Sequence, residues 1–343
     1  MKKRTLNILK NLFFLLLGVA LLWISFRNIE LQKLWEGIKN ANYIWILVAI
    51  ACAIISHCFR ALRWNLLINA LDYKTRFSTT FYAVMIGYMA NLVVPRMGEI
   101  ARCGVLTKKE KIPFNALLGT VISERLFDLV VLILLLVTVI LVQWQLLGDL
   151  VVSWFNPLIE STTTKSVSLF IGLFVVFCLF IVTFWIFYRK KIKQTTVYQK
   201  VISLLLGLVD GMKTIKTMHR KGLFLFYTLM IWVFYVLMIW LPFYMLPETS
   251  HLDLAAGITF LAIGSLGIVA PVPGGIGAYH FIGKTLLHGF YHISELGAVS
   301  FVTITHAAQT FMQIVVGGLS YFLLFFVDKK PPLNGNTTTN SER

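Results

Sequence analysis

The sequence predicts an all-α polytopic integral membrane protein with about six full spans and two re-entrant helical hairpins in an inverted repeat. Three observations predict this fold class. Of the 343 residues, 58% are hydrophobic and 13% are charged, whereas soluble domains carry about 25% charged residues. The Lys and Arg residues gather in loops between apolar runs, which is the positive-inside pattern of membrane proteins. Two apolar runs are interrupted by Pro and Gly, one in each half of the chain.

The N-terminal segment is predicted to begin in the cytoplasm and to cross the membrane at residues 11–26. Positions 2–4 are Lys, Lys and Arg, and basic residues stay on the cytoplasmic side. A cleaved signal peptide is the alternative, but large residues such as Trp23 stand where cleavage requires small ones. Residues 27–42 alternate charged and apolar side chains at helical spacing, so a short amphipathic helix is expected at the outer interface.

Residues 43–59 form the next predicted span, and Arg60 and Arg63 after it are expected at the level of the cytoplasmic headgroups. Residues 328–343 are polar and rich in Thr and Asn, so they are predicted to be a disordered cytoplasmic tail. The remaining full spans are predicted at residues 126–147, 167–188, 223–246 and 298–326.

The first interrupted run, residues 77–106, breaks at Pro95. If it crossed the membrane once, the loop 189–222, with nine Lys or Arg against one acid, would face outside. That inversion violates the positive-inside rule, and the return limb is too short and too charged for the ~20 residues of a span. We therefore expect a re-entrant hairpin that enters from the cytoplasm and returns to it.

The second interrupted run, residues 255–292, carries two prolines and three glycines between Pro271 and His280, which cannot continue a helix. Two full spans are the alternative, but the polar limb 280–292 favours a hairpin. Each hairpin stands between two spans, and the two enter from opposite sides, so the halves form an inverted repeat whose breaks meet near the midplane. Residues 1–327 are thus predicted to be one transmembrane domain.

Ionisable side chains near the first break are candidates for function, because an ionisable residue at membrane depth costs at least ~2.5 kcal/mol. Glu99 and Arg102 stand at i,i+3 and are expected to pair, which leaves Arg96 beside the break. An arginine beside a broken helix end suits phosphate recognition.

A second charged group follows at Glu124, Arg125 and Asp128. Glu124 and Asp128 share one helical face, and Arg125 can reach Asp128. Together with the first group, these side chains are predicted to contact a charged headgroup. The alternative is that they lie at the cytoplasmic interface and only pair with one another.

The last predicted span carries a polar stripe at helical spacing. Such a stripe must face protein or water rather than lipid, so it either lines a cavity or makes hydrogen bonds between helices. Its members are Thr305, His306, Gln309 and Gln313.

The glycines Gly274, Gly275 and Gly277 precede a predicted helix start. Their backbone N–H groups are candidates for an anion-binding nest. The alternative is close packing of helices through small residues.

The sequence predicts no metal, no cofactor and no nucleic acid partner. The four cysteines show no CxxC spacing. His288 and His292 stand at i,i+4 with Glu295 beyond them, but the set needed for a zinc site is incomplete. No nucleotide-binding or hydrolase motif is present, and the net charge of +16 lies in loops that can face anionic lipid.

Three motifs together resemble the lysylphosphatidylglycerol synthase transmembrane (flippase-like) family over about residues 10–327. The resemblance implies a polytopic bacterial inner-membrane protein with cytoplasmic termini, two re-entrant segments and a lipid-accessible cavity. In bifunctional members this domain is thought to move aminoacylated lipid between leaflets. The motifs comprise Asn91, Pro95, Arg96, Gly98, Glu99 and Arg102, then Glu124, Arg125 and Asp128, then Pro273, Gly274, Gly275 and Gly277.

Two departures from the family pattern shape the expected function. The soluble aminoacyl-transferase domain is not found in this sequence, so synthase activity is not expected. Family members commonly carry Glu where this chain has His280, which points to a more anionic or a glycosylated lipid.

The function expected from the sequence is translocation of a phospholipid or lipid-linked intermediate through a polar cavity between the two hairpins. The alternative is a non-transporting scaffold that presents lipid to a glycosyl- or acyl-transferase partner. An intramembrane enzyme is disfavoured because no complete catalytic set is visible. The predicted cavity residues are Asn91, Pro95, Arg96, Glu99, Arg102, Glu124, Arg125, Asp128, Gly274, Gly275, Gly277, His280, His306 and Gln309.

Overall fold

A computed structural model describes residues 2–144, 220–269, 272–328 and 331–334, and within these ranges the chain is helical and contains no strand. The all-α class is therefore confirmed. The predicted span 167–188 and most of the basic loop 189–222 lie outside the described residues. The α-helices are α1 (Lys2–Phe26), α2 (Leu31–Lys39), α3 (Ile44–Asn69), α4 (Phe77–Val93), α5 (Met97–Glu110), α6 (Phe114–Val142), α10 (Lys221–Trp240), α11 (Leu254–Val269), α12 (Ala278–Tyr291) and α13 (Glu295–Phe322).

Short turns of other helix types continue or interrupt these helices. A 3-10 segment, η1 (Leu241–Met245), extends α10, where Pro242 removes a backbone donor. A second, η2 (Pro273–Gly275), stands between α11 and α12. A π-helical turn, η3 (Leu323–Val327), closes α13.

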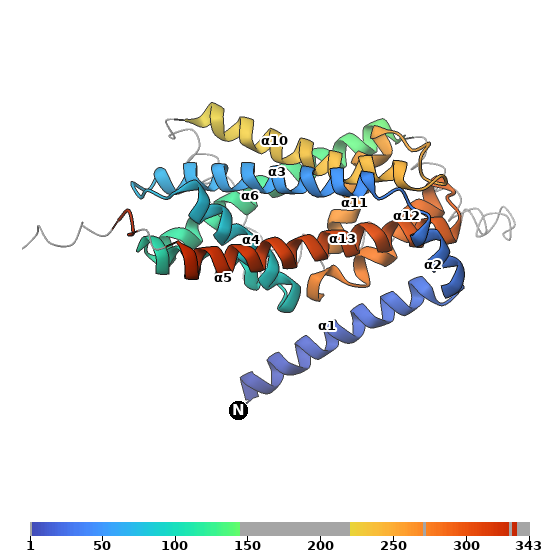
Figure 1. Ribbon diagram of the computed structural model, residues 1–343, viewed down its shortest axis with the longest axis horizontal. Helices are drawn as coiled ribbons and strands as arrows, with labels where there is room; N and C mark the ends of the chain where they lie inside the picture. The colour runs from blue at the N-terminus through green and yellow to red at the C-terminus, as the bar shows by residue number, and fades with distance from the viewer. Residues whose placement is uncertain (1, 145–219, 270–271, 329–330, 335–343) are drawn as a thin grey trace, which may run out of the picture. The chain divides into compact units, whose positions relative to one another are not determined.

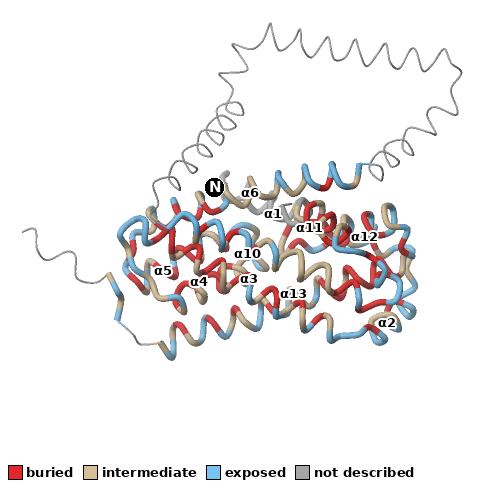
Figure 2. The backbone as a smooth tube through the Cα atoms, turned by 90° about the horizontal axis from the view of Figure 1, so that it is seen from above, coloured by how far each residue is buried: buried red, intermediate tan, exposed pale blue. Residues whose placement is uncertain are grey.

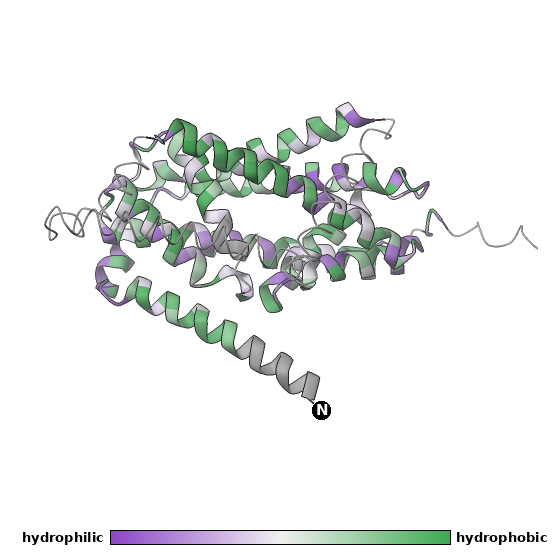
Figure 3. Ribbon diagram, turned by 180° about the vertical axis from the view of Figure 1, so that it is seen from behind, coloured by the Kyte–Doolittle hydropathy of each residue, from purple (hydrophilic) through white to green (hydrophobic). Residues whose placement is uncertain are grey.

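Four described helices are long and apolar enough to cross a membrane: α3, α6, α10 with η1, and α13 with η3. Residues Phe13–Phe26 and Leu31–Lys39 meet at an angle of 86° and count as a fifth span at most. Figure 3 shows apolar colour along α10 and the described part of α1, with hydrophilic colour gathered at loops near the helix ends. These residues therefore form a multi-pass membrane protein.

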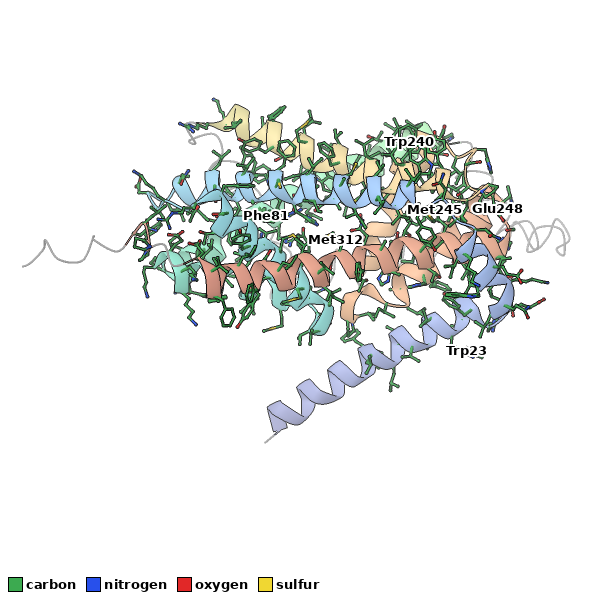
Figure 4. The ribbon with its side chains drawn as sticks, in the orientation of Figure 1. Trp23, Phe81, Trp240, Met245, Glu248 and Met312 are labelled. Atoms are coloured by element: carbon green, nitrogen blue, oxygen red, sulfur yellow. The ribbon has the colours of Figure 1, made fainter. Side chains whose placement is uncertain are left out.

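The α1–α2 corner confirms the predicted change from an apolar span to an amphipathic helix. On α2, Leu34 is buried, while the apolar side chains of Leu31 and Trp35 are exposed, as suits a helix that lies at a membrane interface. In Figure 4, Trp23 projects from α1 away from the other helices. An exposed tryptophan on an apolar helix is typical of a lipid-facing surface.

The helices α3 and α10 pack against each other in antiparallel directions. Trp45 contacts Tyr244, Ser56 bonds to the Ile231 carbonyl, and further along α3 an arginine bonds to Thr228 on α10. As residue numbers rise on α3, they fall on α10. This pair forms the frame on which both broken segments pack.

The two helix–break–helix segments lie at opposite ends of the α3–α10 pair. Near the start of α3, Ile46 joins a core cluster with Phe260 of α11 and Leu287 of α12. Near its end, Trp64 bonds to Thr120 of α6 and lies against the arginine of α5. Figure 1 shows the same separation, with α4 and α5 toward one end and α11 and α12 toward the other. This is the arrangement that an inverted repeat predicts.

The first break is a tight turn between α4 and α5. Asn91 accepts a hydrogen bond at Oδ1 from the Gly98 N–H at 2.6 Å, and Arg96 has a left-handed backbone with φ 64°. A side chain at Gly98 would overlap the Gly87 carbonyl oxygen. The two limbs therefore approach at van der Waals distance because both crossing positions are glycine.

The second break contacts both α1 and α4. A β-carbon at Gly277, where φ is +84°, would overlap the carbonyl oxygen of Gly18 in α1. A β-carbon at Gly274 would lie 3.4 Å from Cδ2 of Leu92, in the last turn of α4. The two breaks thus meet, as expected from the sequence.

Burial separates the helices into inner and outer ones. Figure 4 places Phe81 and Met312 in the middle of the bundle, where Met312 lies in a buried cluster with Ala53 and Met85. Figure 2 shows α6 largely exposed or intermediate beyond its first turns. Since its exposed side chains include Leu134 and Leu141, that surface suits lipid.

The start of the C-terminal tail is bound to the first hairpin. The Leu333 N–H donates to Glu110 Oε2 at 3.0 Å, and the Asn334 amide bonds both to the Glu110 carbonyl and to the backbone of Lys74. Leu333 and Asn334 thus find hydrogen-bond partners at the end of α5, whereas residues 335–343 of the predicted tail lie outside the described part of the chain.

Candidate functional site

A cluster of seven charged side chains joins α3, α5 and α6 near the first break. These helices are separate in sequence and are joined here by ion pairs and by the hydrogen bond from Trp64 to Thr120. We call this set the arginine cluster. Its members are Arg60 and Arg63 from α3, Glu99 and Arg102 from α5, and Glu124, Arg125 and Asp128 from α6.

Arg60 connects both carboxylates of α6 to α10. Its guanidinium donates to Glu124 Oε1, and its Nη1 donates to Asp128 Oδ2 at 3.0 Å. Its Nη2 donates to Tyr235 Oη, also at 3.0 Å. Tyr235 in turn lies 3.3 Å from the hydroxyl of Tyr88 on α4. One guanidinium therefore links three helices and begins a polar chain toward the middle of the bundle.

Arg63 and Arg102 hold the same carboxylates from the other sides. Arg63, whose side chain is 0% exposed, donates from Nη2 to Asp128 Oδ1 at 2.8 Å. Arg102 Nη1 donates to Glu124 Oε2 at 3.1 Å, while its guanidinium stacks 4.6 Å above the Trp64 ring. Glu124 is fully buried, so both its oxygens accept bonds from arginines, as a buried carboxylate requires.

One edge of the cluster is more accessible to solvent than the rest. Arg125 Nη2 lies 2.9 Å from Glu99 Oε1, and these side chains are 41% and 27% exposed. Arg125 Nη1 also lies 3.8 Å from Asp128 Oδ2. Four arginines face three carboxylates in the cluster, which leaves an excess of one positive charge. An uncompensated buried charge is unfavourable, so the cluster is suited to binding an anion.

One sequence expectation about this region is wrong. Glu99 and Arg102 do not pair with each other, because α6 brings Arg125 to Glu99 and Glu124 to Arg102. Arg60 and Arg63, which were expected at the level of the headgroups, are buried side chains of α3, which continues as one helix to Asn69. The expected contact of Arg125 with Asp128 is present.

The sequence does contain a signal that Arg60 and Arg63 belong to the cluster, and it lies on the same helix. Arg60 and Arg63 stand at i,i+3, and the apolar residues 66–68 follow them. A run that stays apolar beyond two arginines indicates a helix that continues past them. Their acidic partners are at least 61 residues further along the chain, so only the folded structure shows the pairing.

A second polar group forms around the second break. His306 Nε2 lies 3.0 Å from the Gly274 carbonyl oxygen. The rings of His280 and His306 are 4.9 Å apart, and we call them the histidine pair. Tyr279 lies beside them, with its hydroxyl 3.5 Å from Thr305 Oγ1. Residues of α12 and α13 that are 26 positions apart thus line one site at the break.

The other predicted residues fall around these two groups. Gln309 places Nε2 3.9 Å from the Met238 sulfur of α10, one helical turn from His306. Pro95 and Asn91 shape the first break, and Gly275 has φ 72° in the second. The close approach at Gly277 favours the packing interpretation for that glycine.

No three His, Cys, Asp or Glu side chains of the described ranges lie close enough to hold a metal. His288 Nδ1 lies 2.8 Å from the Ile293 carbonyl oxygen, at the end of α12. Among the described residues, the partner of His288 is therefore a backbone carbonyl group.

The fold and site define a polytopic all-α membrane protein with two broken helices and a buried arginine cluster. Residues 11–317 match the family described as the lysylphosphatidylglycerol synthase TM region. The chain belongs to this family, which confirms the resemblance drawn from its motifs.

One curated relative is the UPF0104 membrane protein MJ1595 of Methanocaldococcus jannaschii. It is 26% identical over 156 residues, which is 43% of this chain and 46% of the relative. The match thus spans less than half the length of the curated relative. No solved structure matches the chain.

Proposed function

We propose that the protein translocates a lipid with an anionic, phosphate-bearing headgroup between the leaflets of the membrane. The substrate is a phospholipid or a lipid-linked intermediate, and the membrane is the bacterial inner membrane with both termini in the cytoplasm. The observation that carries the proposal is the excess arginine in the cluster beside the first break. A protein that only anchored itself in lipid would gain nothing from burying an unbalanced charge.

The geometry of the cluster supports a headgroup site at its accessible edge. The inner arginines are held by Glu124 and Asp128, so they act as a positive platform. At the edge, the Arg125–Glu99 pair is partly exposed and can exchange a carboxylate for a phosphate. Guanidinium groups bind phosphate in two parallel hydrogen bonds, which suits the exposed end of Arg125.

The two breaks support movement through the protein rather than binding alone. They enter from opposite ends of the α3–α10 pair and meet at Leu92 and Gly274. Broken helices that meet from opposite sides are typical of transporters in which one half rocks against the other.

The test is exchange of fluorescent phosphatidylglycerol between leaflets of liposomes that contain the purified protein. We expect Arg125→Gln to slow exchange about tenfold or more, since a charge-assisted hydrogen bond contributes ~1.5–3 kcal/mol. Lys33→Gln is the matched control, because it removes one exposed positive charge from α2 without touching the cluster.

Absence of exchange with the wild-type protein would contradict translocation and favour the scaffold for a transferase. Equal rates of lipid exchange by Arg125→Gln and Lys33→Gln would show that the headgroup site does not lie at the edge of the cluster.

A further inference from the structure

We propose that the histidine pair binds one proton and that the protonated pair is a second, pH-dependent site for the anionic headgroup. This inference rests on the proposed function. It adds what drives capture and release of the headgroup at the second break. It identifies the protonated imidazoles as the group that holds the phosphate after the arginine cluster.

The first step is the hydrogen-bonding state of the two rings. A carbonyl oxygen only accepts, so His306 Nε2 donates its hydrogen to Gly274. His280 is 7% exposed, and its Nδ1 has no hydrogen-bond partner among the described residues. A buried ring nitrogen without a hydrogen-bond partner is unfavourable in a packed core that binds no ligand. In the tautomer that carries its hydrogen on Nε2, this nitrogen can accept a proton, and the ring stands beside another imidazole.

The second step is that the pair holds one proton at most. The ring centroids are 4.9 Å apart, and two imidazolium ions at this distance in a buried site repel strongly. Interacting groups of this kind titrate as a unit. One proton therefore adds a single positive charge beside the second break, which matches the single negative charge of a phosphodiester.

The third step considers the other titratable groups on the described parts of the helices that pack around the histidine pair. The described side chains of α1 from Phe13 onward and those of α11 before residue 266 include no titratable group. On α12 and α13, Lys284 and Glu295 pair with each other, and Tyr279 contacts Thr305. α4 contributes the tyrosines Tyr82 and Tyr88. Because no carboxylate of the described residues contacts the pair, the protonated pair takes its counter-charge from a ligand.

The fourth step connects the histidine pair to the arginine cluster. Tyr235 and Tyr88 extend the hydrogen bonds of Arg60 into the bundle. Gln309 stands one turn from His306 and reaches α10 at Met238, one turn beyond Tyr235. Tyr235 and the contact of Gln309 with Met238 thus lie one turn apart on α10, and in this proposal the headgroup passes along them from the arginine cluster to the histidine pair.

The experiment counts protons taken up as short-chain phosphatidylglycerol binds to the full-length protein in detergent. Calorimetry in buffers of different ionisation enthalpy gives this number. With wild type we expect uptake approaching one proton per lipid and an affinity that falls by up to about tenfold per pH unit as the pH rises. Short-chain phosphatidylcholine and inorganic phosphate are the comparison ligands.

The variants are His280→Gln and His306→Gln, with His251→Gln as control because His251 is exposed in the loop before α11. We expect the first two to lose proton uptake and pH dependence while still binding lipid at the arginine cluster, and the control to match wild type. Thermal unfolding of each variant checks that it is folded.

Lipid binding without proton uptake, in a protein that still exchanges lipid in liposomes, would overturn this inference and leave the proposed function standing. If wild type exchanges no lipid, the proposed function fails by its own test. Equal proton uptake with inorganic phosphate would show a site for free phosphate and overturn the assignment to a lipid headgroup.

Discussion

Arg63 and Asp128 are 65 positions apart in the chain, and Arg63 Nη2 lies 2.8 Å from Asp128 Oδ1 inside the bundle. This contact fixes the end of α3 against the middle of α6. It also makes the stability of the bundle depend on charge balance in the arginine cluster, since neither partner reaches water freely.

The first prediction concerns Glu124, which forms ion pairs with three arginines. Glu124→Gln should lower the free energy of unfolding by about 3–5 kcal/mol, because guanidinium groups then remain buried with too few anions. Thermal unfolding in detergent measures this loss. Glu36→Gln, on the exposed side of α2, should change stability by less than about 0.5 kcal/mol. Equal effects of both changes would mean that the cluster does not stabilise the fold.

The second prediction is a double-mutant cycle between Arg63 and Asp128. Arg63→Met removes the arginine nearest to Asp128, at 2.8 Å, and Asp128→Leu leaves Arg63 with Glu124 at 3.4 Å. The double variant removes both charges and should be destabilised by less than the sum, with a coupling of about 1–3 kcal/mol. Strict additivity would contradict a direct contribution of this pair.

The third prediction compares two glycines of the same hairpin limb. Gly277→Ala should destabilise the protein and loosen α1, because the new methyl group overlaps the Gly18 carbonyl and φ is +84°. Gly289→Ala has open space around it and should be neutral or stabilise by up to about 1 kcal/mol. Protease accessibility of α1 and thermal unfolding measure the two effects. Equal tolerance of both changes would show that α1 does not pack on the second break.

The fourth prediction concerns the tail contact. Asn334 makes three hydrogen bonds to the backbone of Lys74 and Glu110, each worth about 1 kcal/mol net. Asn334→Ala should therefore increase hydrogen exchange in residues 72–76 and 108–112. Gln32→Ala, at an exposed position of α2, is the control and should leave these segments unchanged. Unchanged exchange in Asn334→Ala would show that the tail does not hold the hairpin.

Much of this architecture follows from the sequence alone. The composition and the spacing of apolar runs determined the all-α membrane fold, since a bilayer admits few backbone solutions and each needs a run of fixed length. Pro95 and the glycines after Pro273 determined where the helices break, because Pro and Gly act locally on the backbone. The contact of Arg125 with Asp128 was predictable for the same reason, as it lies within one helical turn.

The tertiary structure alone decided which charges on different helices meet. The sequence paired Glu99 with Arg102 and gave Arg60 and Arg63 no partner, whereas the folded bundle gives those side chains partners on other helices. It likewise brought His280 against His306 by packing α12 on α13. Local propensity fixes a helix and its breaks, but the partner of a buried charge depends on which helices pack together, and a buried charge is tolerated only where such a partner is supplied.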